Sequence, residues 1–255
     1  MSTMNTKEAL YNFCLRLGDN NLILGQRLAE WCSNGPILEE DLAMTNLSLD
    51  HFGQAEFMYE YAAELEGKNR TADDIAYLRN ERGYFNSLIT EQPNGDFAFT
   101  MMKQLLYSTF AKYLYETLSA SSDKRLSELA ARALKEIKYH LRHSSEWVIR
   151  LGNGTEESRI RAQQALNELW WYTADMFVVN ETDKELIKAQ IITDLSGLYP
   201  KWKSSVEETL KLANLTIPAH GHMYKGGYDG NHTEHLGHIL CELQYLQRAY
   251  PGAKW

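Results

Sequence analysis

The chain has 255 residues, of which 44% are hydrophobic and 24% charged, as in an ordinary globular protein with a substantial core. Its formal net charge of -8 argues against a nucleic-acid partner, because such a surface needs basic residues to neutralise phosphates. No apolar run approaches the roughly 20 residues of a membrane span, and the three widely spaced cysteines indicate free thiols, so we expect a cytoplasmic protein without a membrane partner.

Helical periodicity runs along most of the chain, whereas alternation typical of strands is nearly absent. We expect long helices at 6–17, 20–33, 37–66, 97–120, 126–151 and 155–177, shorter ones near 72–90, 183–196 and 199–214, and a last one at 232–249. Segment 220–232 is the clearly irregular long loop. The pattern predicts an all-α single domain over residues 1–255, with a four-helix bundle and additional flanking helices.

The predicted helix 37–66 has two apolar faces. One stripe consists of Leu38, Leu42, Leu49, Phe52 and Tyr59, and the roughly opposite one of Leu47, Met58 and Leu65. A helix that is apolar on two faces is expected to lie between other helices.

A candidate metal-ligand pair lies in the stretch KEIKYHLRH, residues 135–143. At 100° per residue, His140 lies inside the apolar stripe of its helix and Glu136 at its edge, so both could reach one ion. A carboxylate-bridged di-iron bundle, however, needs a Glu-x-x-His pair on each of two helices, and this chain contains none. We therefore favour a hydrogen-bonded pair without metal over a metal site that also uses Glu56 and Glu60.

Five of the eight histidines fall between positions 220 and 238. His232, His235 and His238 follow one another at three-residue spacing, and zinc accepts imidazole together with a carboxylate such as that of Glu234. That spacing turns the third imidazole about 120° away from the first around the helix. We favour histidines that cap the helix start and line an interface, with zinc as the alternative.

The run LRNERGYFNSL, residues 78–88, combines arginines with aromatic and amide side chains that could hold a phosphorylated, adenine-bearing ligand. The candidate ligand contacts are Arg79, Arg82, Tyr84, Phe85 and Asn86. The alternative is a surface helix in which the two arginines pair with Glu81.

Several stretches together resemble one family. They are LRLGDN (15–20), GQRLAEWC (25–32), GQA (53–55), EQPNGDFA (91–98), KEIKYHLRHSSEWVIRLGNGT (135–155) and HTEHLGHILCELQYLQRAYPGAKW (232–255). With these motifs the chain resembles the C subunit of the bacterial phenylacetyl-CoA epoxidase complex, a multicomponent monooxygenase. The resemblance is weakest around 178–215.

This resemblance implies a ferritin-like fold and a non-catalytic, structural role beside a homologous A subunit that holds the di-iron centre. A B subunit bridges the assembly, and a reductase supplies electrons from NADPH for the epoxidation of phenylacetyl-CoA in phenylacetate catabolism. The chain itself would carry no cofactor and no catalytic residue, and Glu136 and His140 would be vestigial. Phenylacetyl-CoA would lie near the subunit border, and the isolated chain could form a homodimer.

The final helix supplies candidate interface residues. Leu236, Leu240, Leu243 and Leu246 make one core-facing stripe. The side chains left for a partner are His235, His238, Gln244, Tyr245, Arg248 and Trp255. Two function classes stay open: a structural subunit, or a self-sufficient metalloenzyme that uses an atypical metal site.

Overall fold

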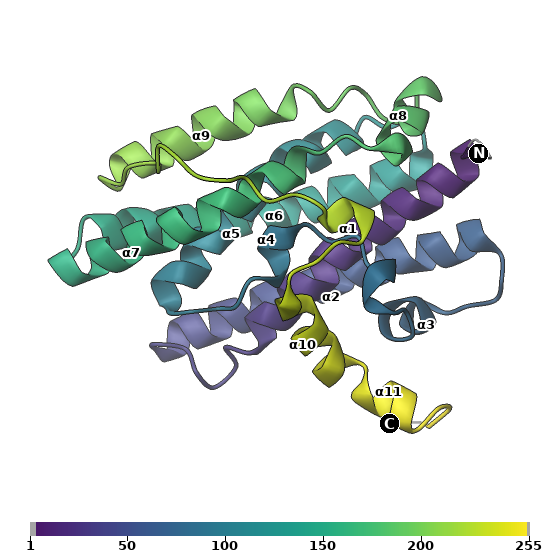
Figure 1. Ribbon diagram of the computed structural model, residues 1–255, viewed down its shortest axis with the longest axis horizontal. Helices are drawn as coiled ribbons and strands as arrows, with labels where there is room; N and C mark the ends of the chain where they lie inside the picture. Colours follow the sequence, from purple (N-terminus) through teal and green to yellow (C-terminus); the bar gives the residue numbers. More distant parts are fainter. Residues whose placement is uncertain (1–3, 254–255) are drawn as a thin grey trace. The chain divides into compact units, whose positions relative to one another are not determined.

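The computed structural model describes residues 4–253, which form helices joined by loops (Figure 1). These residues contain no β-strand, so the predicted all-α class is confirmed. The α-helices are α1 (Thr6–Ala29), α2 (Leu38–Glu66), α3 (Ala72–Tyr77), α4 (Leu88–Glu91), α5 (Phe97–Leu118), α6 (Lys124–Gly152), α7 (Glu156–Leu169), α8 (Glu181–Lys188), α9 (Leu198–Leu212), α10 (Glu234–Leu243) and α11 (Tyr245–Ala249). Three 3-10 helices join them: η1 (Glu81–Gly83), η2 (Trp170–Phe177) and η3 (Gly227–Asp229).

The described residues divide into two compact units. The first contains the chain up to Pro93, Val179–Ala189 and the chain from Gly226 onward. The second contains Asn94–Val178 and Gln190–Lys225. That the whole chain is one domain stays a prediction.

Helices α1 and α2 of the first unit lie side by side and antiparallel, since Gly18 faces Tyr59 whereas Gly25 faces Phe52. A Cβ atom on Gly18 would lie 2.5 Å from Tyr59 Cε1, so only glycine permits this approach of the two helices. Ser48 on α2 donates to the Gly25 carbonyl oxygen at 2.8 Å. Side chains of α2 therefore lie directly on the backbone of α1, in addition to the apolar packing between the two helices.

The prediction of two helices at 6–17 and 20–33 is wrong, because α1 continues through the polar run GDNN at 18–21. Asn21 donates to the Leu17 carbonyl oxygen at 2.8 Å, and its own Oδ1 lies 2.8 Å from His51 Nδ1 of α2. These polar side chains are buried and bonded, so they need no break in the helix.

The predicted helix at 72–90 is instead α3, η1 and α4, with extended backbone between them. The backbone N–H of Phe85 donates to Asp19 Oδ2 at 2.8 Å, and that of Ser87 donates to Asn20 Oδ1 at 2.8 Å. Side chains of α1 thus accept hydrogen bonds from backbone N–H groups that would have bonded within a continuous helix.

The first stripe predicted for α2 is only partly buried. Tyr59 of this stripe lies in the core and Phe52 is half-buried, and Leu47 and Met58 of the opposite stripe are buried as expected. Leu38, Leu42 and Leu49 are exposed, so the prediction that they pack within this chain is wrong.

In the second unit, α6 confirms the apolar stripe that the sequence predicts. Its buried residues recur every three or four positions: Leu126, Ala130, Ala133, Ile137, His140, Ser144, Val148 and Gly152. α6 packs against α5, and α9 also lies on α5, where Trp202 Nε1 donates to the Leu106 carbonyl oxygen at 2.9 Å.

The C-terminal helix predicted at 232–249 is two helices, α10 and α11, which meet at Gln244 (Figure 1). Leu236 and Leu240 are buried as predicted, but Leu246 is exposed, so the core stripe ends before α11. Gln244, predicted to be available to a partner, is buried and bonded within the chain.

Candidate functional site

A buried ion pair between α1 and the segment after α3 organises the first unit. Asp19 accepts a hydrogen bond from Tyr59 Oη at 2.6 Å, one from Phe85 N at 2.8 Å, and two from the Arg79 guanidinium, of which the one from Nη1 is 3.0 Å long. The same guanidinium lies 4.1 Å from the centre of the Tyr84 ring. All acceptor directions of the carboxylate are thus used inside the chain.

The electrostatics of this group follow from burial and from that ion pair. Burial would lower the pKa of Arg79, but the Asp19 carboxylate outweighs it and the pKa is raised. Burial, opposed by the charge of Arg79, raises the pKa of Tyr84 to about 12. Both side chains therefore keep one protonation state over the whole physiological range, which suits a structural role.

This geometry bears on the five predicted ligand contacts. Tyr84 and Asn86 are buried, and the side chain of Arg79 is only 9% exposed. The guanidinium of Arg79 also donates to the carbonyl oxygens of Ile75 and Gly83. Arg82 is exposed and Phe85 half-buried. Only these last two are open to a ligand, and their contact with coenzyme A stays a prediction.

A second buried cluster fixes the start of α10. Glu91 Oε1 accepts from Thr233 N at 2.7 Å and from Thr233 Oγ1 at 2.8 Å. Glu91 Oε2 accepts from Asn86 Nδ2 at 2.9 Å and lies 2.9 Å from His232 Nδ1. His232 Nε2 donates to the Tyr84 carbonyl oxygen at 2.8 Å, since a carbonyl can only accept.

Sequence reasoning missed Asp19, Glu91 and His232 as parts of one system. Their partners lie far along the chain: Asp19 binds Arg79 and Phe85, and Glu91 binds His232. The one sequence feature that indicated buried polar contacts was the polar run at 18–21 inside an otherwise apolar helix. His232 is used as a structural group, so the zinc alternative loses one of its three ligands.

The predicted interface residues lie on α10 and α11. His238, Tyr245 and Arg248 are exposed, His235 is half-buried, and Trp255 lies outside the described residues. Arg248 Nη2 donates to the Arg79 carbonyl oxygen at 2.8 Å, and Gln244 Nε2 donates to the same oxygen at 2.9 Å. Both α11 and its junction with α10 are therefore tied to the segment that carries Arg79.

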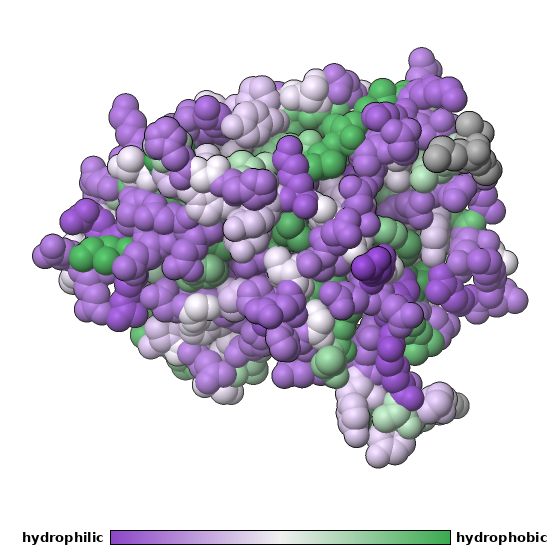
Figure 2. All heavy atoms as spheres, viewed as in Figure 1, coloured by the Kyte–Doolittle hydropathy of each residue, from purple (hydrophilic) through white to green (hydrophobic). Residues whose placement is uncertain are grey.

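A groove of about 540 Å3 runs between this C-terminal segment and η1. It is lined by Asn80, Glu81, Gly237, Leu240, Cys241, Gln244, Tyr245, Arg248 and Ala249. Within the first unit, α10 and α11 lead away from α4 (Figure 1), and in Figure 2 the same projection, at the lower right, carries mostly pale, weakly polar residues. Tyr245 is 62% exposed, so its ring is available to a partner.

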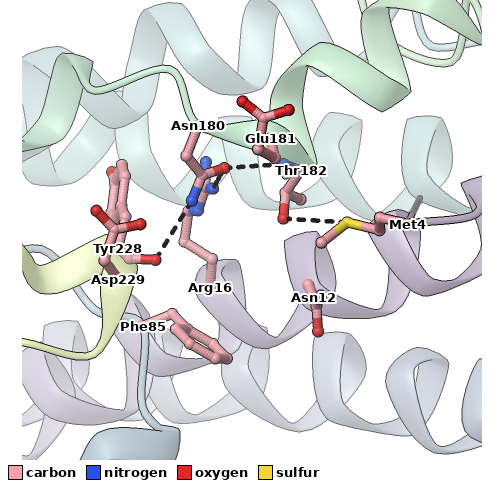
Figure 3. A pocket seen from close by; sticks show the side chains of 9 residues that line it. All are labelled: Met4, Asn12, Arg16, Phe85, Asn180, Glu181, Thr182, Tyr228 and Asp229. Carbon is pink, nitrogen blue, oxygen red and sulfur yellow. Dashed lines mark hydrogen bonds between the residues drawn. The ribbon is translucent and has the colours of Figure 1, made fainter. Parts of the chain in front are cut away.

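A smaller pocket of about 290 Å3 lies beside α8 (Figure 3). Its central side chain is Arg16, whose Nη1 donates to Asp183 at 2.7 Å and whose Nη2 donates to Asn180 at 2.8 Å. The guanidinium also stacks on Tyr228 at 4.2 Å, and Phe85 closes one side. Because the charge of Arg16 is already neutralised by Asp183, this arginine is a poor anchor for an anionic ligand.

The Glu136–His140 pair lies on α6, where His140 is buried and Glu136 half-buried. Among residues 4–253, no group of three His, Cys, Asp or Glu side chains comes together as a metal site would require. This donor set does not match the ligands of a di-iron centre. That the chain binds no metal stays a prediction.

Comparison with known proteins shows the family to which this all-α chain belongs. It matches, over residues 1–255, the family described as phenylacetic acid catabolic protein, and it belongs to that family, whose fold is ferritin-like and helical. It is 45% identical over 243 residues to the C subunit of 1,2-phenylacetyl-CoA epoxidase from Escherichia coli K12. That similarity covers 95% of this chain and 98% of the relative. Within the described part of the chain, no helix is long and apolar enough to cross a membrane.

Proposed function

We propose that this chain is the non-catalytic C subunit of a cytoplasmic phenylacetyl-CoA 1,2-epoxidase in aerobic phenylacetate catabolism. The observation that carries the proposal is the 45% identity to the C subunit of such an epoxidase, which extends over nearly the full length of both chains. At this identity and coverage, the role of one protein is a strong guide to that of the other.

The use of the buried charged groups supports a structural role. Asp19 is paired with Arg79, Asp183 with Arg16, and Glu91 with His232, each inside the first unit. A catalytic acid or base needs a free position for substrate, whereas these groups bond segments of one chain to each other. This use of buried charged groups supports the proposal of a structural role.

The proposed partners are a homologous catalytic A subunit, which would hold the di-iron centre, and a bridging B subunit. The exposed part of the C-terminal segment, with His238, Tyr245 and Arg248, is the proposed docking surface for the A subunit or for a second copy of this chain. Arg82 and Phe85 are the proposed contacts to coenzyme A near the subunit border. Aromatic and arginine side chains are the usual central residues of protein interfaces.

The proposal is tested by mixing the separately purified chain and A subunit and measuring their association by light scattering after size exclusion. We expect a stable complex, no turnover of phenylacetyl-CoA by the chain alone, and turnover only when the A subunit, the B subunit and the reductase are added. Tyr245→Ala should weaken association while the helical circular dichroism stays unchanged. Turnover by the chain alone, or stoichiometric metal in it, would favour the metalloenzyme alternative.

A further inference from the structure

The outer face of α2 carries a row of exposed leucines. Leu38 is 71% exposed, Leu42 55% and Leu49 60%. Together with the half-buried Thr45 and Phe52, these residues alternate four and three positions apart, which is the spacing of the a and d positions in a coiled coil. The row is therefore a straight apolar seam along one side of the helix.

The three leucines of this seam are exposed, and only its Phe52 end also contacts α1. α2 packs on α1 along a neighbouring side, where Phe52 and Tyr59 lie against Gly25 and Gly18 of α1, whereas Leu47 and Met58 on the side opposite the seam are buried. A contiguous exposed apolar face of this kind is typical of a surface that another protein covers. The seam thus has the spacing of apolar side chains on which one amphipathic helix packs.

The charge of α2 decides which kind of helix it can receive. Leu38–Glu66 contains eight acidic residues and no lysine or arginine. Glu39, Glu56 and Glu60 are exposed, and Glu56 and Glu60 continue the line of the seam toward the C-terminus of α2. Two copies of α2 packed on each other through this seam would bring the exposed Glu56 and Glu60 of both copies into one interface, and such like charges disfavour pairing.

We propose that the α2 seam, defined by Leu38, Leu42, Thr45, Leu49 and Phe52, docks a helix of a different subunit. That partner helix has an apolar stripe bordered by lysine or arginine. The inference rests on the proposed function, which supplies the homologous catalytic subunit as the partner to be tested. The leucines provide the buried area, and the acidic residues select a basic partner and steer its approach.

The test measures the dissociation constant of the chain and the purified catalytic subunit by isothermal titration calorimetry. The double variant Leu42→Glu/Leu49→Glu changes two exposed positions, so it should fold normally and raise the dissociation constant by about tenfold or more. The variant Glu56→Lys/Glu60→Lys should weaken binding and reduce its dependence on salt, because it removes the charge attraction. Leu212→Glu, at a leucine of α9 that is 58% exposed, is the matched control and should bind as the unchanged chain does.

Each result decides the inference. If the unchanged chain binds and the double leucine variant binds equally well, the α2 seam is not the docking face, while the proposed function stands. If the unchanged chain does not bind the catalytic subunit at all, both the inference about the α2 seam and the proposed function are wrong. If the isolated chain forms a dimer that the double leucine variant dissolves, the seam belongs to a second copy and the inference is overturned.

Discussion

His232 and Glu91 form a buried ion pair in which His232 Nδ1 lies 2.9 Å from Glu91 Oε2, and neither side chain is exposed to solvent. The pair joins the residue before the N-cap of α10 to the last residue of α4. With Nε2 donating to the Tyr84 carbonyl oxygen, an imidazolium satisfies both contacts at once. One of the contacts that hold the start of α10 therefore depends on the protonation of His232.

The first prediction concerns the pH dependence of this junction. Burial lowers the pKa of His232, but the hydrogen bond and charge of Glu91 outweigh it, so the pKa is raised above the ordinary value of about 6.5. A raised pKa in the folded state means that the stabilisation is fully present below about pH 6.5 and is lost as the pH rises through the folded value. Hydrogen exchange of α10, corrected for intrinsic rates, should accelerate across that range.

The control for this pH effect is His238→Gln, which changes an exposed histidine of the same helix and should leave the profile unaltered. His232→Ala should expose α10 to exchange at all pH values, since it leaves Glu91 buried without its cation, at a cost of about 3 kcal/mol. An α10 whose exchange is unchanged in that variant would show that the ion pair does not hold the segment.

A second prediction separates structural from surface arginines. Arg79→Ala removes the partner of the fully buried Asp19 and should lower the free energy of unfolding by about 3–5 kcal/mol. Arg82→Ala, three residues away at an exposed position, should change it by less than about 0.5 kcal/mol. Urea denaturation of both variants is the measurement, and equal effects would contradict the network as described.

A third prediction uses two glycines of the α1–α2 pair. A Cβ on Gly18 would overlap the Tyr59 ring, so Gly18→Ala should destabilise the protein by about 1–3 kcal/mol. Gly53 has open space around it inside α2, so Gly53→Ala should stabilise by about 0.5–1 kcal/mol. The midpoint temperature of thermal denaturation should therefore fall for Gly18→Ala and rise for Gly53→Ala. If Gly18→Ala is as stable as the unaltered chain, α1 and α2 do not approach each other this closely.

A fourth prediction concerns coenzyme A. Because Arg82 is the exposed arginine of the candidate ligand contacts, Arg82→Glu should raise KM for phenylacetyl-CoA in the assembled complex several-fold with kcat little changed. Arg159→Glu, at an exposed arginine of α7, is the control. If KM stays the same while the complex remains intact, Arg82 does not contact the ligand.

The sequence predicted helices well where one apolar stripe was enough to define them. The stripe of α6 is correct from Leu126 to Val148, because only a helix brings those positions onto one face. Periodicity does not tell what covers a second apolar face, so it predicts that Leu38 and Leu42 lie against other helices of this chain, although they are exposed. It also missed the break at Gln244, whose side-chain amide donates to Tyr84, 160 residues earlier in the chain.

The candidate site was less predictable than the fold. Arg79 and Tyr84 look like ligand contacts in a sequence because arginine and tyrosine are common in binding sites. The actual partner of Arg79 is Asp19, which lies 60 residues earlier in a helix whose polar run suggested a break. Ion pairs between residues so far apart in the sequence are set by the packing of α1 on its neighbours. Local residue patterns cannot predict that packing.

We propose that this chain supports catalysis without taking part in its chemistry. The most direct measurement is the rate of phenylacetyl-CoA epoxidation by a complex reassembled with Glu136→Gln/His140→Gln, with assembly verified by light scattering and iron counted per catalytic subunit. We predict an unchanged iron content and a turnover within about twofold of the unaltered complex. The proposal would be contradicted if the variant complex assembles fully but loses its turnover. It would also be contradicted if the variant complex contains less iron, by an amount that matches the amount of this chain.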